Sequence, residues 1–196
     1  MQWNNHSREV PEGAHALFGA SSYHWTNYED DCKKMEEVYR NNLAKEEGTK
    51  LHAFAAECIT LKRKLQGRDT LAKHINDAIG FRMDAEVVLY YSPYFFGTTD
   101  AISFRNNPDK SSDFKYLLRI HDLKTGKIPA KMRQLEVYAA LFFLEYQINP
   151  EETEMEFRIY QNDDIMIGNP TAKDIKPLMN KIILFDKRIE KIKLEG

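Results

Sequence analysis

The sequence predicts an α/β protein with a mixed central sheet of four or five strands and helices on both sides. Two observations predict this class. Some segments are rich in β-branched and aromatic residues, with apolar side chains at every second position, while others place apolar side chains every three or four residues. The chain has 196 residues, of which 42% are hydrophobic, so it can bury a core, and we expect residues 1–196 to form a single domain.

Helices are expected in the first part of the chain. One is predicted over residues 27–45, where Asn27 can cap the first turn and acidic residues follow it. Gly48 is expected to break the helical pattern, and a second helix follows it to about Leu65. A third, shorter helix is predicted over residues 70–82.

The remaining elements follow from the same patterns. Strands are predicted over 85–91, over 96–104 and 115–124 on the two sides of a polar turn at 106–113, and over 154–160 and 164–167. The segments beside the polar turn look like two strands of one hairpin. A long apolar helix is predicted over 130–147, with Pro129 suited to its first turn, and a final helix begins near Thr171 and Asp174.

The second strand of that hairpin carries charge where it is otherwise apolar. Ile120, Asp122 and Lys124 share one face, because side chains in a strand repeat every two residues. Burying charge is costly unless it is paired or bound to a metal. If the strands pair in register, Asp100 adds a second carboxylate at the same place. Two acids and a lysine there would make a divalent-metal site, and Mg²⁺ takes only one or two carboxylates.

Four ordered motifs resemble those of the PD-(D/E)XK nuclease superfamily, in particular its RecB-like and phage-type exonuclease branch. They are Gly48-Thr-Lys-Leu-His52, Gly97-x-x-Asp100, Asp122-x-Lys124-Thr-Gly and Gln134-x-x-x-Tyr138. They cover roughly residues 48–138 with family-like spacings. The resemblance implies a restriction-endonuclease-like core, and the order and pairing of the strands are inferred from it.

The resemblance also implies the site. The metal ligands that it implies, for one or two Mg²⁺ or Mn²⁺ ions, are His52, Asp100, Asp122 and the backbone carbonyl of Leu123. An imidazole ligand suits Mn²⁺ better than Mg²⁺. Lys124 would position or help deprotonate the attacking water, or neutralise developing charge, and the sequence does not decide between these roles. Gln134 and Tyr138 border the active site, where they would hold a phosphate or orient the catalytic groups.

Further residues are candidates for substrate contact. These are Ser21, Ser22, Gln134, Tyr138, Lys127 and Lys131, with Arg133 nearby. On composition alone, residues 19–25 read as a loop and turn before a helix, whereas the family resemblance favours contact of the serines with DNA. Glu86 lies where relatives sometimes carry an extra acid; its alternative is an exposed residue at the start of a strand. The basic run 62–64 either complements a helix dipole or lies on the DNA path.

Composition excludes several classes of protein. No apolar run approaches the ~20 residues of a membrane span, and the N-terminus lacks the layout of a signal peptide, so we expect a cytoplasmic protein without a membrane partner. Two cysteines are too few for a disulfide framework, or for the four-cysteine iron–sulfur cluster of some RecB-like relatives. The formal charge of −2 is not that of a passive nucleic-acid binder, but it is compatible with a local basic groove.

The function expected from these observations is metal-dependent hydrolysis of DNA. The resemblance favours an exonuclease acting on single- or double-stranded DNA ends in recombination or repair, and a phage or mobile-element role would fit. A structure-selective or nicking endonuclease and an RNA nuclease are alternatives that use the same site. An alternative of another class is a non-catalytic module that binds DNA ends or protein. A homo-oligomer or a recombination partner protein is compatible with the sequence, which predicts no interface.

Overall fold

The structure is a computed structural model that describes residues 16–28, 32–126 and 128–195, with the backbone alone at Ser22 and Tyr23. The chain divides into two compact units, Met1–Glu47 and Gly48–Gly196. The boundary falls within one long helix, α1 (Lys33–Thr60). All of the candidate site residues except the two serines belong to the second unit.

The N-terminal unit consists, in its described part, of a 3₁₀ helix and the first half of α1. The 3₁₀ helix η1 (Ala20–Asn27) occupies the segment predicted as a loop and turn, and the Trp25 indole donates a hydrogen bond of 3.1 Å to the Gly19 carbonyl. Along α1, Met35, Tyr39 and Leu43 form a partly exposed stripe at four-residue spacing.

The predicted break at Gly48 is wrong, because α1 continues through this residue. A glycine inside a helix costs about 1 kcal/mol relative to alanine, which is too little to end a helix that other contacts support. The contact here is close. A Cβ atom on Gly48 would lie 2.7 Å from Oγ1 of Thr125, so glycine is needed for the helix to approach the loop after β3 (Tyr116–Leu123).

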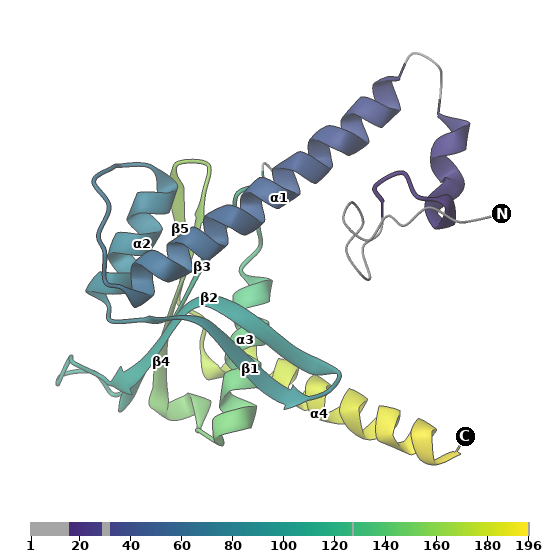
Figure 1. Ribbon diagram of the computed structural model, residues 1–196. Helices are drawn as coiled ribbons and strands as arrows, with labels where there is room; N and C mark the ends of the chain where they lie inside the picture. Colours follow the sequence, from purple (N-terminus) through teal and green to yellow (C-terminus); the bar gives the residue numbers. More distant parts are fainter. Residues whose placement is uncertain (1–15, 29–31, 127, 196) are drawn as a thin grey trace. The chain divides into compact units, whose positions relative to one another are not determined.

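The second unit is built on a mixed five-stranded sheet, with the strands in sequence order (Figure 1). The other strands are β1 (Asp84–Ser92), β2 (Phe95–Asn106), β4 (Thr153–Gln161) and β5 (Asp164–Gly168). The pairing of β3 with β4 is parallel, and the other three pairings are antiparallel. The parallel pair requires a crossover connection, which α3 (Arg133–Tyr146) provides.

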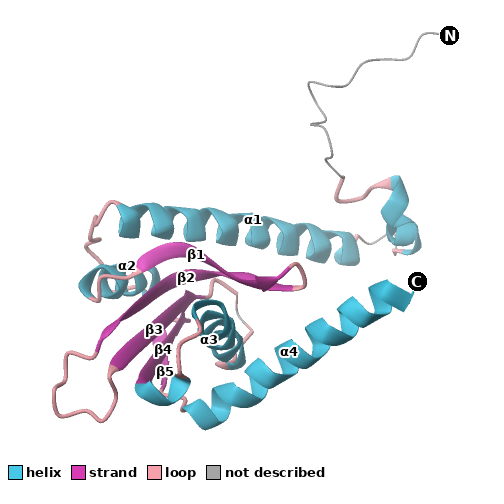
Figure 2. Cartoon of the chain, turned by 90° about the horizontal axis from the view of Figure 1, so that it is seen from below, coloured by secondary structure: helices cyan, strands magenta, loops and turns pink. Residues whose placement is uncertain are grey.

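Helices cover both faces of this sheet (Figure 2). On one face, α3 packs on β1, β2 and β3, and α4 (Ala172–Glu195) packs against α3. On the other, α2 (Thr70–Gly80) packs on β3 and β4, and shares a core with the end of α1 through Ala55, Cys58 and Ile59. The predicted α/β class, with a mixed sheet of four or five strands flanked by helices, is therefore confirmed. At this coarse level it is consistent with a restriction-endonuclease-like core.

Several helix boundaries differ from prediction. Helix α3 begins at Arg133 rather than next to Pro129. The expected cap of α4 is present, since the Asp174 carboxylate accepts hydrogen bonds from the backbone N–H and the hydroxyl of Thr171. Phe185 of α4, which shares a helix face with the buried Ile182, is half exposed. Among the helices in the described residues, we find none with the length and apolarity required to cross a bilayer.

Candidate active site

The antiparallel pairing of β2 and β3 brings the two central carboxylates together, as the sequence predicted. Ile102 pairs with Ile120 and Ala101 with His121, and the same register extended by one residue places Asp100 opposite Asp122. Asp122 is only 3% exposed, because it lies at the end of a strand whose other positions are almost all in the core. The site therefore forms where the hairpin strands leave the apolar interior.

Asp100 is held by two donors, one at each carboxylate oxygen. One of its oxygens lies 3.2 Å from Nδ1 of His52 on α1, and the other accepts the backbone N–H of Leu123 at 2.7 Å. Burial alone would raise the pKa of Asp100, but the hydrogen bond and charge of His52, with the Leu123 N–H, lower it overall. The hydrogen bond to Asp100 in turn raises the pKa of His52, against the opposing effect of burial.

Asp122 is in the opposite electrostatic situation. Burial, and then the charge of Asp100, raise its pKa to about 6, although Lys124 and His52 act in the other direction. Its Oδ2 lies 3.0 Å from Nζ of Lys124, and apart from this ion pair that buried oxygen has no hydrogen-bond partner in the described part of the chain. A buried carboxylate beside a second carboxylate, with one ammonium group, is an electrostatically strained arrangement that an added cation would relieve.

A chain of polar contacts connects this pair to helix α3. Nζ of Lys124 donates to the side-chain carbonyl of Gln134 at 2.9 Å, and the Gln134 amide donates to the Tyr138 hydroxyl at 3.0 Å. The two helix residues lie four apart and so share one face. The Tyr138 ring lies over Gly97, where a Cβ atom would be 2.8 Å from the ring. Gly97 and Tyr138, which belong to separate sequence motifs, are thus parts of one contact.

Glu86 lies closer to the site than its sequence position alone indicated. It falls opposite Asp100 in the β1–β2 register, between the pairs Ala85–Ala101 and Val87–Thr99. Partial burial, followed by the charge of Asp100, raises its pKa, although its side chain remains exposed. Its backbone has a φ of 52°, a left-handed conformation that is rare for a non-glycine residue and is concentrated at functional sites.

The remaining predicted residues are not joined to this cluster by a contact in the described residues. Lys131 is exposed, and Arg133 pairs with Glu136 at 2.7 Å. Lys127 lies outside the described residues, as does the side chain of Ser22. Ser21 belongs to the N-terminal unit. The substrate contacts proposed for these residues, and the metal ligation proposed for the Leu123 carbonyl, stay predictions.

Sequence reasoning missed one residue beside the site, His74 of α2. It is 1% exposed, and neither ring nitrogen has a hydrogen-bond partner among the residues that the structure describes. Burial lowers its pKa to about 4 despite the nearby charge of Asp100. The ring packs edge-on against Tyr160 of β4, with 5.1 Å between centroids. Its place in the sequence could have indicated its burial, because His74 falls on the apolar face of α2 with Leu71, Ile75 and Ala78.

The donor set is suited to a divalent cation. His52, Asp100 and Asp122 offer an imidazole and two carboxylates, which suit Mn²⁺ and, for the oxygens, Mg²⁺. As positioned in the described part of the chain, no three His, Cys, Asp or Glu side chains already form a metal-holding group. The side chains instead form two ion pairs, His52 with Asp100 and Lys124 with Asp122, so binding a metal requires them to reorient.

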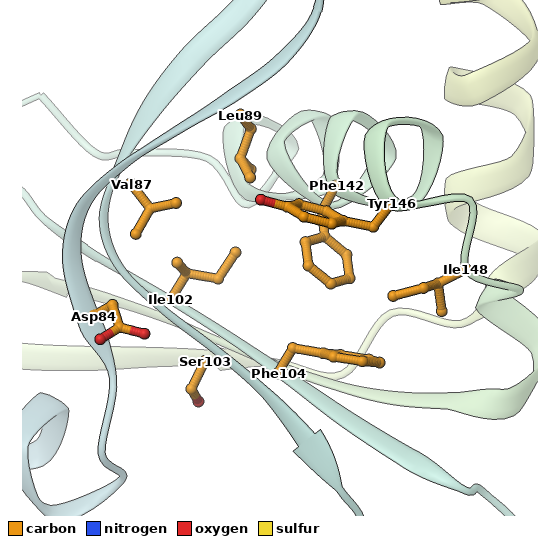
Figure 3. A pocket seen from close by; sticks show the side chains of 9 residues that line it. All are labelled: Asp84, Val87, Leu89, Ile102, Ser103, Phe104, Phe142, Tyr146 and Ile148. Carbon is orange, nitrogen blue, oxygen red and sulfur yellow. The ribbon is translucent and has the colours of Figure 1, made fainter.

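An apolar cavity of about 260 Å³ lies between α3 and the β1–β2 strands, separate from this cluster (Figure 3). In it Phe142 and Tyr146 of α3 face Ile102 and Phe104 of β2. Asp84 is the one charged residue in its lining, and none of the candidate site residues contributes to it. The cavity therefore lacks the paired ionisable groups that distinguish the candidate active site.

The fold and the site together define a class: an α/β protein whose mixed sheet carries two carboxylates and a lysine at the ends of two paired strands. Comparisons of the chain with protein-family models, with curated proteins and with solved structures find no match. The resemblance to PD-(D/E)XK nucleases therefore depends on the motif residues themselves and on the chemistry that they can perform.

Proposed function

We propose that this protein is a divalent-metal-dependent nuclease of the PD-(D/E)XK type, and that it hydrolyses phosphodiester bonds at DNA ends. One observation carries the proposal: the buried Asp122 carboxylate, with its pKa raised to about 6, lies beside Asp100 and 3.0 Å from Lys124. Strongly perturbed ionisable groups with specific charged partners are typical of catalytic sites. A purely structural role would not require two acids at this place.

The metal would be held by Asp100 and Asp122, with His52 and the Leu123 carbonyl as further ligands. When bound, it would supply positive charge to the phosphate and lower the pKa of a water molecule. Lys124 would add a second positive charge at the phosphate, where negative charge develops in the transition state. Gln134 would fix the direction of the Lys124 ammonium through its carbonyl oxygen, and Tyr138 would fix Gln134.

The ion pairs define what the protein's own groups must do before catalysis. His52 must lose its proton to become a ligand, and its hydrogen bond to Asp100 opposes that loss. Asp122 must be ionised, which burial opposes. Both requirements are met more readily as the pH rises, so activity would increase from mildly acidic to neutral pH.

The test is degradation of linear and covalently closed circular DNA with Mn²⁺, Mg²⁺ or a chelator. Loss of linear DNA alone, stopped by chelator, is the expected result, and cutting of the circle would favour the endonuclease alternative. Asp122→Ala and Lys124→Ala should each abolish degradation. Matched controls come from the exposed turn before β3, where Asp113→Ala and Lys110→Ala should change nothing.

Two outcomes would contradict the proposal. If the Asp122 and Lys124 variants digest DNA as well as the wild type, the activity belongs to another site or to a contaminant. If wild-type protein binds DNA ends but degrades neither DNA nor RNA with any metal, the fold serves as a binding module. Degradation of RNA in place of DNA would support metal-dependent phosphodiester hydrolysis and would change the proposed substrate to RNA.

A further inference from the structure

The outer half of the β1–β2 hairpin has one covered face and one open face. On the covered face, Leu89 and Thr99 are fully buried, and Gly97 lies against the Tyr138 ring of α3. The open face carries Val88, Tyr90 and Phe96, whose exposed fractions are 55%, 48% and 61%. Three large apolar side chains exposed together on one strand pair are unusual for a surface that only meets water, and such patches mark binding sites.

Two of these side chains form a ready-made stacking surface. Tyr90 and Phe96 are directly paired across the two strands, and their rings are stacked with centroids 6.4 Å apart and planes inclined by 29°. Aromatic side chains held in this way are the usual platforms for unpaired nucleobases, because every base has a π face. We name the surface formed by Val88, Tyr90 and Phe96 the aromatic platform.

The aromatic platform is continuous with the candidate active site along the same strands. Phe96, Thr98 and Asp100 lie at every second position of β2 and so share one face. The pair Val88–Thr98 lies between the Tyr90–Phe96 pair and Asp100. At about 3.3 Å per residue, Phe96 and Asp100 are about 13 Å apart along the strand. A strand of nucleic acid cut at Asp100 would thus have its neighbouring bases within reach of the platform.

The hairpin is also fixed in place. The backbone N–H of Tyr90 donates to the Glu145 carboxylate of α3 at 2.8 Å, and Nζ of Lys193 on α4 lies 4.8 Å from the centre of the Tyr94 ring in the turn. The first contact engages a backbone donor of β1, which is an edge strand of the sheet. Addition of a partner's strand along this edge is therefore disfavoured, and binding through the open side-chain face is favoured.

We infer that the aromatic platform binds unpaired bases of a single-stranded DNA end by stacking and thereby delivers the adjoining phosphodiester to the candidate active site. This inference rests on the proposed function, and it names a single-stranded end as the substrate. Stacking is indifferent to base identity, so recognition is sequence-tolerant. Duplex DNA, whose bases are already stacked on one another, gains nothing from the platform.

The test is a binding measurement that does not depend on cleavage. A short fluorescently labelled single-stranded DNA of mixed sequence is titrated with the full-length protein in chelator, and binding is followed by anisotropy. Tyr90→Ala and Phe96→Ala should each weaken binding by about tenfold, whereas Tyr90→Phe and Phe96→Tyr should retain it. Phe114→Ala, in the polar turn before β3, is the matched control for loss of a partly exposed aromatic residue. Thermal unfolding establishes that all variants are folded.

A second probe separates stacking from phosphate binding. The same oligonucleotide with abasic sites keeps every phosphate and loses the bases, so wild-type protein should bind it no better than Phe96→Ala binds the normal strand. Equal binding of abasic and normal strands, or unchanged binding by both alanine variants, would overturn the inference. A shift in the protein's own oligomeric state on Phe96→Ala, with DNA binding intact, would instead assign the platform to a protein partner and also overturn it.

Failure of this inference and failure of the proposed function would give different experimental results. Stacking-dependent binding without metal-dependent cleavage would refute the proposed nuclease activity and support base binding by the aromatic platform. The converse result is cleavage that depends on Asp122, with no effect of the platform variants on binding or on the rate of single-strand degradation. It would refute base binding by the aromatic platform and support the proposed nuclease activity.

Discussion

Replacing Asp122 by asparagine is expected to stabilise the metal-free protein at neutral pH. Asparagine keeps the shape of the side chain and removes a charge that burial and Asp100 make unfavourable. The pKa of the Asp122 carboxyl is about 6 in the folded protein and 3.8 as its ordinary value. A difference of about 2, at about 1.4 kcal/mol for each, corresponds to about 3 kcal/mol. This figure already includes the opposing attraction of Lys124, which is one of the contributions to the pKa of Asp122.

The direction in which the stability difference between the two proteins changes with pH follows from proton linkage at Asp122. Between about pH 4 and about pH 6, the folded protein binds a proton at Asp122 that the unfolded chain has released, so the contribution of Asp122 to wild-type stability falls as the pH rises through this range. The asparagine variant has no such proton. The two proteins should therefore differ little near pH 4, and the variant should be more stable by about 1–3 kcal/mol near pH 7. Titrating groups that do not interact with Asp122 cancel in the comparison, whereas the pKa of His52, which the Asp122 charge raises, falls in the variant.

The assay is urea unfolding of both proteins in chelator at several pH values, with Asp113→Asn as a control at an exposed site. Excess Mn²⁺ should then raise the stability of the wild type and not that of Asp122→Asn, because a ligand that binds only the folded state stabilises it. A variant that is less stable than the wild type at every pH would refute the electrostatic reasoning. Equal stabilisation of both proteins by Mn²⁺ would refute the metal assignment.

Three further predictions concern the surroundings of the site. Because burial lowers the pKa of His74 to about 4, the unfolded chain takes up a proton first on acidification, so the contribution of His74 to stability should fall by up to about 3 kcal/mol between about pH 6.5 and pH 4. In urea titrations, His74→Phe should lose less stability than the wild type over this range; an identical loss would contradict the assignment. Gly97→Ala should cost about 1–3 kcal/mol and displace Tyr138, since the new Cβ would lie 2.8 Å from its ring, whereas Gly126→Ala, with nothing within 4 Å, should be neutral in thermal unfolding. Finally, Mn²⁺ affinity measured by calorimetry should rise with pH through the titration of His52, whose pKa is raised by Asp100, and should lose part of that dependence in His52→Gln.

The hairpin that holds the two acids could be predicted from sequence because its evidence is local. Period-two patterns mark both strands, and the polar turn between them leaves antiparallel pairing as the simple solution. The register that brings Asp100 opposite Asp122 is conditional in the sequence, and the structure supplies it. The shared face of Gln134 and Tyr138, by contrast, follows from helical geometry alone.

The structural features that could not be predicted from the sequence depend on contacts between distant segments. Gly48 looks like a helix breaker until the loop at Thr125 is seen against it, and Gly97 has no evident purpose until the Tyr138 ring covers it. The left-handed conformation of Glu86 also has no signal in the sequence, since nothing in the residue itself favours it. His74 falls on the apolar face of α2, but no local pattern specifies that this face packs on β3 and β4.

The parallel alignment of β3 and β4 has a consequence for when the protein can act during its own synthesis. The backbone N–H of Lys124 donates to the carbonyl of Tyr160 at 2.9 Å, so the position of this lysine is fixed by a strand that leaves the ribosome well after it. Pairings between distant segments are also slow to form. Under the proposed function, a nascent chain would thus carry both candidate acidic ligands and remain inert toward the nucleic acids around it until translation has passed β4.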